Sequence, residues 1–335
     1  MDRNSDSHAP TADAQALADA RSPSATDAAE ISPLHADEGP IKRALVNFVP
    51  PATLIAVVLF WMLAPRTITE NEWTLVIVSA AISFFVLGLE FVLERHEGWR
   101  LNWTEFSTDL FYQILYSTVI AWAVLAFADE PLMALKDRLG ITTLWLMELP
   151  LVVQAFAVLF LIEFGQYWMH RLMHDWYPAW LTHAPHHHVT QLNAMKGAVG
   201  NPIELFLISL SVVALFDFDV VAIFCGLSML TVISSFAHAN VRSDPPLIYS
   251  YVFTTIRHHS LHHTALSYED TRCNYGNSII LFDRILGTYR EGESKVVGQD
   301  DRRRLSIYEQ FMFPFQPLID RIKGAGRDKP TSADT

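Results

Sequence analysis

Five long apolar segments constrain the fold of this chain more than any other feature. Each approaches the roughly 20 residues that an α-helix needs to cross a bilayer. Because an unpaired backbone N–H or C=O group is costly in hydrocarbon, a segment of this kind is expected to be helical. Charged residues make up 18% of the chain, below the fraction of about 25% that is usual for soluble domains. We therefore predict an all-α, polytopic membrane helix bundle. The predicted spans are Leu45–Ala64, Trp73–Leu93, Leu110–Ala128, Leu149–Tyr167 and Val220–Ala237.

Three shorter segments are expected to behave differently. Leu205–Phe216 is too short to span comfortably, and we expect it to form a tight hairpin with the following span, turning at residues 217–219. Residues 131–139 predict a short interfacial helix, and residues 305–323 predict an amphipathic stretch that lies on a surface.

The first forty residues predict a disordered tail. They hold eight acidic residues against Arg3 and Arg21, and they lack the apolar core of a signal peptide. With the predicted spans, this divides the chain into an acidic tail, N-terminal transmembrane helices, a histidine-rich region and a C-terminal cytoplasmic tail with the amphipathic segment. The respective ranges are 1–40, 41–148, 149–291 and 292–335.

The lysines and arginines predict the orientation. Thirteen of the 24 follow Ala237, and basic residues favour the cytoplasmic side of a membrane. If the hairpin returns the chain to the side it left, residues 168–204 and the N-terminus beside Lys42 and Arg43 lie on that side too. We therefore expect an integral membrane protein, of a bacterial inner membrane or alternatively of the endoplasmic reticulum, with a histidine-rich cap in the cytoplasm.

Eleven of the fourteen histidines fall between residues 170 and 263. They form the groups HRLMH, HAPHHH and HHSLHH, with one further histidine in FAHANV. Residues one helical turn apart share a face, so we expect the histidines at the first and fourth positions of HAPHH and HSLHH to bind one ion. The adjacent histidine would then reach a second ion. Nine ligands exceed what one ion accepts and argue for a di-metal site. The candidate ligands are His170, His174, His183, His186, His187, His238, His259, His262 and His263.

Several points remain open from the residues alone. The two cysteines, Cys225 and Cys273, are too few for a thiolate site, and imidazole suits zinc, copper, iron and nickel alike. On spacing alone, a core or hydrogen-bonding role for His238 is as plausible as ligation. Each crowded cluster also allows the HxxHH or the HxxxHH register. The histidines outside the groups are expected at the surface: His8, His35 and His96.

Together these motifs resemble the fatty acid hydroxylase / sterol desaturase superfamily of integral-membrane di-iron enzymes. The resemblance covers about 160–291, through EFGQYWMHRLMH, HAPHH, NAMKGAVGNPIE, FAHANV, HSLHH and NYGNSIILFDRILGTYR. The NYG and GTY elements of the ending separate this family from acyl-CoA desaturases and alkane hydroxylases. One position departs from the pattern, because many relatives carry histidine where this chain has Asn201, which leaves the exact ligand count open.

The resemblance implies a catalytic region at 149–291 that holds two non-haem iron ions and uses O2 to attack an unactivated C–H bond of a fatty acyl, sterol or related lipid. We expect hydroxylation, with desaturation as the alternative. The usual HxxHH register implies that His188 and His258 are spare. Since the sequence shows no flavin, haem or nicotinamide motif, electrons must come from a ferredoxin or cytochrome b5 type partner with its reductase. No nucleic-acid partner is expected.

Polar residues near the boxes are expected to hold the second nitrogen of each ligand ring. Glu163 lies two helical turns before His170, although a snorkelling role at the interface is an alternative. Nearby aromatic residues are expected to anchor the membrane interface, and some to line a lipid channel. The candidate ring partners are Glu163, Asp175, Asn193, Asn201, Glu204, Asp270 and Asn274, and the aromatic residues are Tyr167, Trp168, Trp176, Tyr177 and Trp180.

A histidine-rich metal transporter is the rival interpretation from another functional class. Transporters place ionisable ligands near the middle of their helices, whereas the histidines here lie at the ends of the apolar segments. The sequence therefore favours the enzyme.

Overall fold

The computed structural model describes residues 39–265, 271–299 and 302–327. Nearly all elements within these ranges are helices, and the β-structure there consists of two isolated bridges. The predicted all-α fold is therefore confirmed. The acidic tail, apart from its last two residues, lies outside the described residues, as do His8 and His35.

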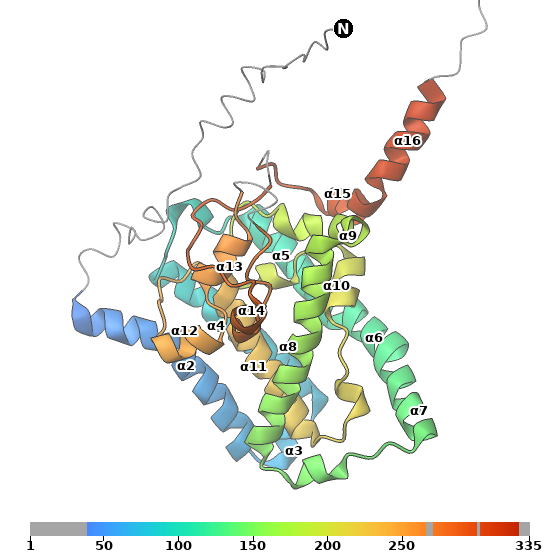
Figure 1. Ribbon diagram of the computed structural model, residues 1–335. Helices are drawn as coiled ribbons and strands as arrows, with labels where there is room; N and C mark the ends of the chain where they lie inside the picture. The colour runs from blue at the N-terminus through green and yellow to red at the C-terminus, as the bar shows by residue number, and fades with distance from the viewer. Residues whose placement is uncertain (1–38, 266–270, 300–301, 328–335) are drawn as a thin grey trace, which may run out of the picture.

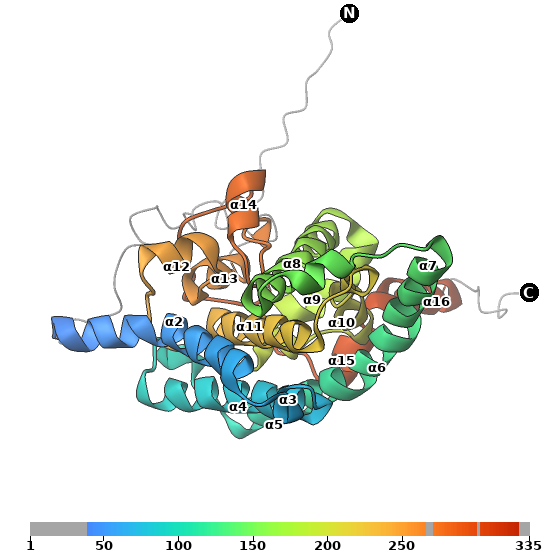
Figure 2. The same ribbon diagram turned by 90° about the horizontal axis from the view of Figure 1, so that it is seen from below.

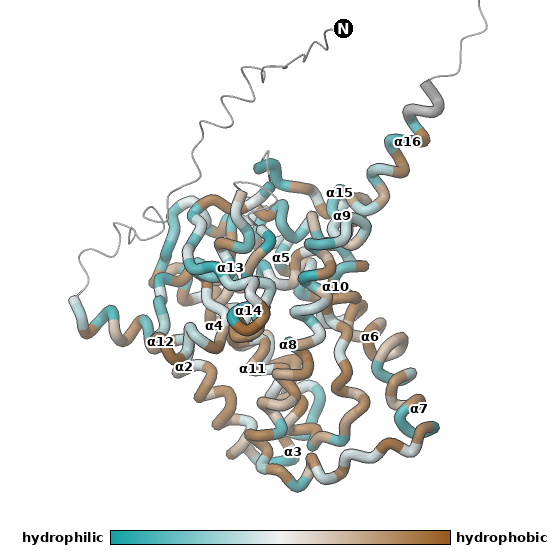
Figure 3. The backbone as a smooth tube through the Cα atoms, viewed as in Figure 1, coloured by the Kyte–Doolittle hydropathy of each residue, from teal (hydrophilic) through white to brown (hydrophobic). Residues whose placement is uncertain are grey.

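Five helices of the described chain are long and apolar enough to cross a membrane. Figure 3 shows the apolar residues along the lower part of the bundle and the polar residues gathered at its upper end, which we call the polar end. The short helix α3 (Arg66–Thr69) joins the first two spans. The five helices are α2 (Pro40–Leu63), α4 (Glu72–Val92), a continuous helix over Trp103–Leu139, α8 (Leu151–Asp175) and α11 (Val220–His238).

The third of these helices is longer than the sequence predicted. Its 37 residues correspond to about 55 Å, against a hydrocarbon core of about 30 Å. Residues 131–139 do form a helix, but it continues the third span through the π-helical turn at Leu125–Asp129 and is not a separate interfacial helix. The helix ends at Gly140, whose φ is 64°. It consists of α5 (Trp103–Leu115), α6 (Ala121–Val124) and α7 (Glu130–Leu139), with π-helical turns at Tyr116–Ile120 and Leu125–Asp129.

Helix α11 is the centre of the bundle. It packs against α8, α2 and α4, and Figure 2 shows it between α2 and α8. Of its apolar window 61% is buried, compared with 22% for α2. A side chain at Gly226 would place its Cβ 2.8 Å from Val158 Cγ1. Glycine at this position therefore allows α8 and α11 to approach closely, which matters because both helices carry candidate ligands.

The predicted hairpin before α11 is present, but its first arm is mostly irregular. Helix α10 (Pro202–Ile208) is short, and the chain then runs without a long helix to the turn at residues 217–219. Asp217 accepts a hydrogen bond from the Thr143 backbone N–H at 2.7 Å. Asp219 caps α11 and pairs with Arg66. The turn is thus fixed at the end of the bundle opposite the polar end (Figure 1).

Short helices and loops form the polar end. The predicted amphipathic stretch at residues 305–323 has two parts that differ in their packing. Its first part packs on the body, where Asn201 Nδ2 donates to the Gln310 carbonyl at 2.8 Å, while α16 (Gln316–Arg327) extends away in Figure 1. The remaining helices are α9 (Tyr177–His187), α12 (Leu247–Val252), α13 (Ile256–His262), α14 (Leu281–Leu286) and α15 (Ile307–Met312).

Candidate metal centre

Nine buried histidines converge at the polar end in two groups. In each group the ligand nitrogens lie within 4.8 Å of one another. The five-nitrogen group contains His170, His174, His183, His187 and His262, and the four-nitrogen group contains His186, His238, His259 and His263. These nine residues are the ligands that the sequence predicts, although binding of a metal by them stays a prediction.

Helix ends bring the histidines together. His170 and His174 are one turn apart near the end of α8, and His238 is the last residue of α11. The other two boxes lie on the short helices α9 and α13, with His263 as the residue that caps α13. The long helices therefore carry ligands out of the apolar part of the bundle, and the short helices close over them.

The pairing inside the two crowded boxes differs from the prediction. The histidines at the first and fifth positions of each five-residue box share a group, as His183 does with His187 and His259 with His263. The histidine at the fourth position, His186 or His262, belongs to the other group. Positions four apart lie closer to the same helix face than positions three apart, since a turn contains 3.6 residues. Each short helix therefore contributes to both groups.

Four of the imidazoles have a fixed orientation because their Nδ1 atoms donate to backbone carbonyls. A carbonyl can only accept, so the proton is on Nδ1 and the lone pair is on Nε2, directed at the other rings. The nitrogen–oxygen distances are 2.7 Å for His170 to Tyr275, 2.7 Å for His186 to Val199, 2.8 Å for His238 to Ser234 and 2.7 Å for His262 to Cys273.

The NYG and GTY ending supplies one of these carbonyls, and the residue just before it supplies another. Asn274, with φ at 51°, lies between Cys273 and Tyr275, whose carbonyls accept from His262 and His170. The Asp283 carboxylate accepts from the Tyr275 N–H at 2.8 Å, and it also accepts from Gly276 N–H and the Thr288 hydroxyl. The motif is therefore a rigid support that aims backbone oxygens at the ligand rings.

Among the predicted side-chain partners that the structure describes, Glu204 contacts a candidate ligand. Its Oε1 lies 2.9 Å from His183 Nδ1. Burial lowers the pKa of His183 to about 3 and raises the pKa of Glu204 to about 8. A cation beside His183 would favour the carboxylate form. A Cβ at Gly200 would lie 2.0 Å from Glu204 Oε2, so glycine makes room for the carboxyl group.

The donor set fits a metal ion. The Nε2 of buried His262 has no hydrogen-bond partner among the described residues, although its Nδ1 does. The Nε2 atoms of His170 and His187 each lie 3.0 Å from Nε2 of His183. Two nitrogens about 2.1 Å from one ion and at right angles to each other would be about 3 Å apart. Burial also lowers the pKa of His187 and His262 well below the usual value, which keeps these rings neutral and able to ligate.

The other predicted ring partners hold loops rather than rings. Glu163 Oε2 accepts from the Ser278 N–H at 2.9 Å, and so fixes the segment that follows Tyr275. Asn274 Nδ2 donates to the carbonyls of His258 and Arg290. These roles were missed because the ring partners are carbonyls, which every residue type has.

Three further predictions of ring partners were wrong or lie outside the description. Asp175 is largely exposed and pairs with Arg272. Asn201 caps α10 and binds the carbonyls of Gln310 and Phe311. Asp270 lies outside the described residues.

Asn193 belongs to a buried ion cluster beside the centre. Its Nδ2 donates to Asp109 at 2.7 Å, and Lys196 Nζ lies 2.5 Å from Glu105 and 2.6 Å from Asp109. Lys196 is 1% exposed, so both acids compensate its charge in a dry environment. The cluster fixes the loop that presents the Val199 carbonyl to His186. This cluster could not be predicted, since its members are far apart along the chain.

The histidines predicted to be spare lie outside both groups. His188 is half-buried against Phe313, and His258 is buried beside Thr255 and Tyr289. His96 was predicted at the surface, but it is buried, with Nε2 2.7 Å from Glu293.

The aromatic residues of the first box do not behave alike. Trp168, Trp176 and Tyr177 are exposed, as an interface role requires. Tyr167 is fully buried, with its hydroxyl 2.8 Å from Thr288, so it is not one of the interface anchors. Trp180 packs against the rings of His174 and His187.

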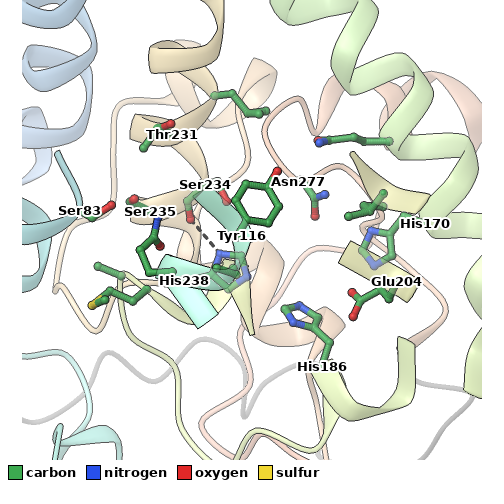
Figure 4. Close-up of a pocket in the computed structure, with 18 of the residues that line it drawn as sticks. Ser83, Tyr116, His170, His186, Glu204, Thr231, Ser234, Ser235, His238 and Asn277 are labelled. Atoms are coloured by element: carbon green, nitrogen blue, oxygen red, sulfur yellow. Dashed lines mark hydrogen bonds between the residues drawn. The ribbon is translucent and has the colours of Figure 1, made fainter. Parts of the chain in front are cut away.

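A cavity of about 140 Å³ opens onto both groups. His170 and His183 of the five-nitrogen group and His186 and His238 of the four-nitrogen group line it. Figure 4 shows Ser83 and Thr231 at the side opposite Glu204 and His170. The cavity thus reaches from the candidate metal centre into the bundle, between α4, α8 and α11. A substrate in this space would meet both metal positions.

The fatty acid hydroxylase family matches residues 155–288, which include all nine histidines. The chain is therefore similar to the fatty acid hydroxylase family over residues 155–288. It is 31% identical over 150 residues to ornithine lipid hydroxylase OlsE of Rhizobium tropici, covering 43% of this chain and 44% of that relative. It is 29% identical over 140 residues to the alkylglycerol monooxygenase of Homo sapiens, covering 41% and 30%.

A third relative carries a different activity in its name. The chain is 22% identical over 167 residues to the "Probable Delta(7)-sterol 5(6)-desaturase" of Neurospora crassa, covering 48% of this chain and 45% of that relative. The chain thus spans less than half the length of each of these three relatives. No solved structure matches the chain.

Proposed function

We propose that the chain is an integral-membrane oxidoreductase that hydroxylates an unactivated C–H bond of a lipid. The observation that carries this proposal is the pair of histidine groups that share one cavity. The nine histidines would hold two iron ions, which supply the activation of O2. The names of the hydroxylase and the monooxygenase among the relatives support the reaction class.

The residues of the chain would have distinct tasks in this reaction. The carbonyls behind His170, His186, His238 and His262 fix these rings so that their Nε2 lone pairs would be available to the ions, and Glu204 orients His183. The buried cap excludes bulk water from the centre. The cavity positions a lipid segment beside both groups. Electrons would come from a ferredoxin or cytochrome b5 type partner with its reductase.

Desaturation of a lipid is the second candidate, because one relative is named as a desaturase. Transport of metal is less well supported, since the histidines lie at one end of the spans and not at their middle.

Comparing lipids from cells that express the wild-type chain with lipids from cells that express His262→Ala tests the reaction. We expect a lipid that gains one oxygen atom with the wild type and no such product with the variant. A product that has instead lost two hydrogen atoms would support desaturation. Unchanged lipids with iron-loaded protein and a working electron supply would contradict both.

We also propose that the polar end faces the cytoplasm of a bacterial inner membrane. Both native cysteines are buried, so single cysteines can report orientation. Glu97, which is 67% exposed, lies at the polar end, and exposed Thr142 lies at the other end. On intact cells an impermeant thiol reagent should label Thr142→Cys and leave Glu97→Cys unmodified. The reverse pattern would contradict the proposed orientation.

A further inference from the structure

The cavity beside the histidine groups has a lining that is unusual for a hydrocarbon chain. Ligand pockets for apolar molecules are mainly hydrophobic with a few polar groups. Here hydroxyl, amide and carboxyl side chains line the cavity from α4, α8, α10 and α11. They include Ser83, Gln166, Glu204, Thr231, Ser234 and Ser235.

Gln166 supplies the lining with a buried acceptor that lacks a donor. Its Oε1 has no hydrogen-bond partner among the described residues. Thr231 and Ser83 donate their hydroxyl protons to backbone carbonyls of their own helices, at 3.0 Å and 3.1 Å. Their oxygens therefore keep lone pairs for the cavity. Because a buried acceptor without a donor is costly, this lining fits a ligand that carries an N–H or O–H group.

The position of Gln166 would place the N–H or O–H group of the ligand close to the reacting atoms. Gln166 precedes His170 by one turn of α8, and both residues line the cavity. Side chains at this spacing are about 5–6 Å apart. A cavity of about 150 Å³ holds a benzene-sized molecule, so the space of about 140 Å³ admits a segment of similar size. The donor group and the attacked carbon must therefore be within a few bonds of each other.

We infer that the substrate carries an N–H or O–H group beside the attacked carbon, and that Gln166 is a specificity-determining residue that accepts a hydrogen bond from it. This inference rests on the proposed function. It assigns the reaction to the polar region of a lipid, near a headgroup or an amide or hydroxyl substituent, and not to a bare stretch of acyl chain.

Two neutral probes that differ at one position test the inference. N-methylhexadecanamide has an N–H group where methyl hexadecanoate has an oxygen. Binding of each is measured by isothermal titration calorimetry to the full iron-loaded protein in nanodiscs. We expect the wild type to bind the amide about tenfold more tightly, the scale of one buried hydrogen bond. Gln166→Leu should reduce this preference to less than threefold, whereas Gln166→Glu, which keeps an acceptor, should retain most of it.

Iron content and melting temperature show whether each variant is folded. If Gln166→Leu does not insert into the membrane, Thr231→Val removes a second acceptor and should reduce the preference about threefold. Equal binding of the two probes by the wild type, tighter binding of the ester, or binding of neither would overturn the inference. A preference unchanged in both variants would also overturn it.

Oxidation of the same probes separates this inference from the proposed function. Oxidised products formed at equal rates from the amide and the ester would contradict the inference alone. A clear preference in binding, with no oxidation of any lipid by iron-loaded and reduced protein, would contradict the proposed function instead.

Discussion

The two histidine groups are supported in different ways. In the five-nitrogen group, the carboxyl group of Glu204 lies against His183, while carbonyls hold His170 and His262. In the four-nitrogen group the described ring partners are the carbonyls of Val199 and Ser234, behind His186 and His238. The five-nitrogen group thus has a carboxyl group in hydrogen-bond contact with a ligand ring, whereas the ring contacts of the four-nitrogen group are to backbone, with Glu204 acting on His186 only at longer range.

The difference means that the groups should respond to different substitutions. A change at Glu204 acts on the five-nitrogen group, whereas the carbonyls of the four-nitrogen group cannot be removed by changing a side chain. At the same time each short helix contributes to both groups. Loss of one ligand can therefore disturb its neighbour through the helix as well as its own group.

The largest effect is expected from removing a ligand. His187→Ala and His259→Ala should each abolish lipid oxidation and lower bound iron, since each removes one nitrogen from a group. The loss should exceed the roughly 10–100-fold that follows when a residue merely supports a ligand. Elemental analysis and product formation in membranes measure both effects.

Adjacent histidines provide matched controls for these variants. His188→Ala and His258→Ala change the same residue type at the next position along the chain, outside both groups. They should keep iron and measurable activity. Iron retained in His259→Ala but lost in His258→Ala would mean that the HxxxHH register binds metal, and our assignment of that box would be wrong.

An intermediate effect is expected at Glu204. Glu204→Gln retains the size of the side chain but cannot carry a negative charge beside His183. We expect iron affinity of the five-nitrogen group to fall about 10–100-fold, seen as faster release of one of two ions to a chelator. Asp175→Asn is the control, because this acid is exposed and contacts no candidate ligand. If Glu204→Gln released both ions faster to the same extent, the two groups would not be supported separately.

The smallest effects are expected at two glycines that distinguish the groups. The Cβ of Gly200→Ala would lie 2.0 Å from Glu204 Oε2, so the carboxyl group must move. The Cβ of Gly197→Ala would meet Ser234 Oγ at 3.1 Å and His238 Cε1 at 3.2 Å, which small shifts can relieve. Chelator release should therefore be faster for the five-nitrogen group in Gly200→Ala, by less than in Glu204→Gln. Gly197→Ala should change the four-nitrogen group less still. Faster release from the four-nitrogen group in Gly200→Ala, or from the five-nitrogen group in Gly197→Ala, would contradict the described geometry.

Much of the architecture could be predicted because local sequence determines it. Apolar length predicted the spans, and the one-turn spacing of HRLMH placed His170 and His174 on one face of α8. The nine residues of the two groups followed from their clustering and from the resemblance. The prediction failed on which two histidines of each box share a group. Histidines three or four positions apart both lie within about one helical turn, and tertiary packing decides between them.

Other features were beyond sequence reasoning for physical reasons. The partners of His170 and His262 are carbonyls of Tyr275 and Cys273, and a carbonyl leaves no mark on residue identity. The cluster around Lys196 joins residues almost a hundred positions apart. Gln166 did carry a usable signal, because a polar residue one turn before His170 in an apolar span is expected to have a role.

The most direct test of the account is the number of metal ions in active protein. Iron per chain should be measured in purified, active wild type and in His263→Ala, which removes a nitrogen from the four-nitrogen group alone. Two ions are expected in the wild type. The variant should retain the ion of the five-nitrogen group and lose the other, together with its activity. A single ion per chain in fully active wild-type protein would contradict the claim that the two groups each bind a metal.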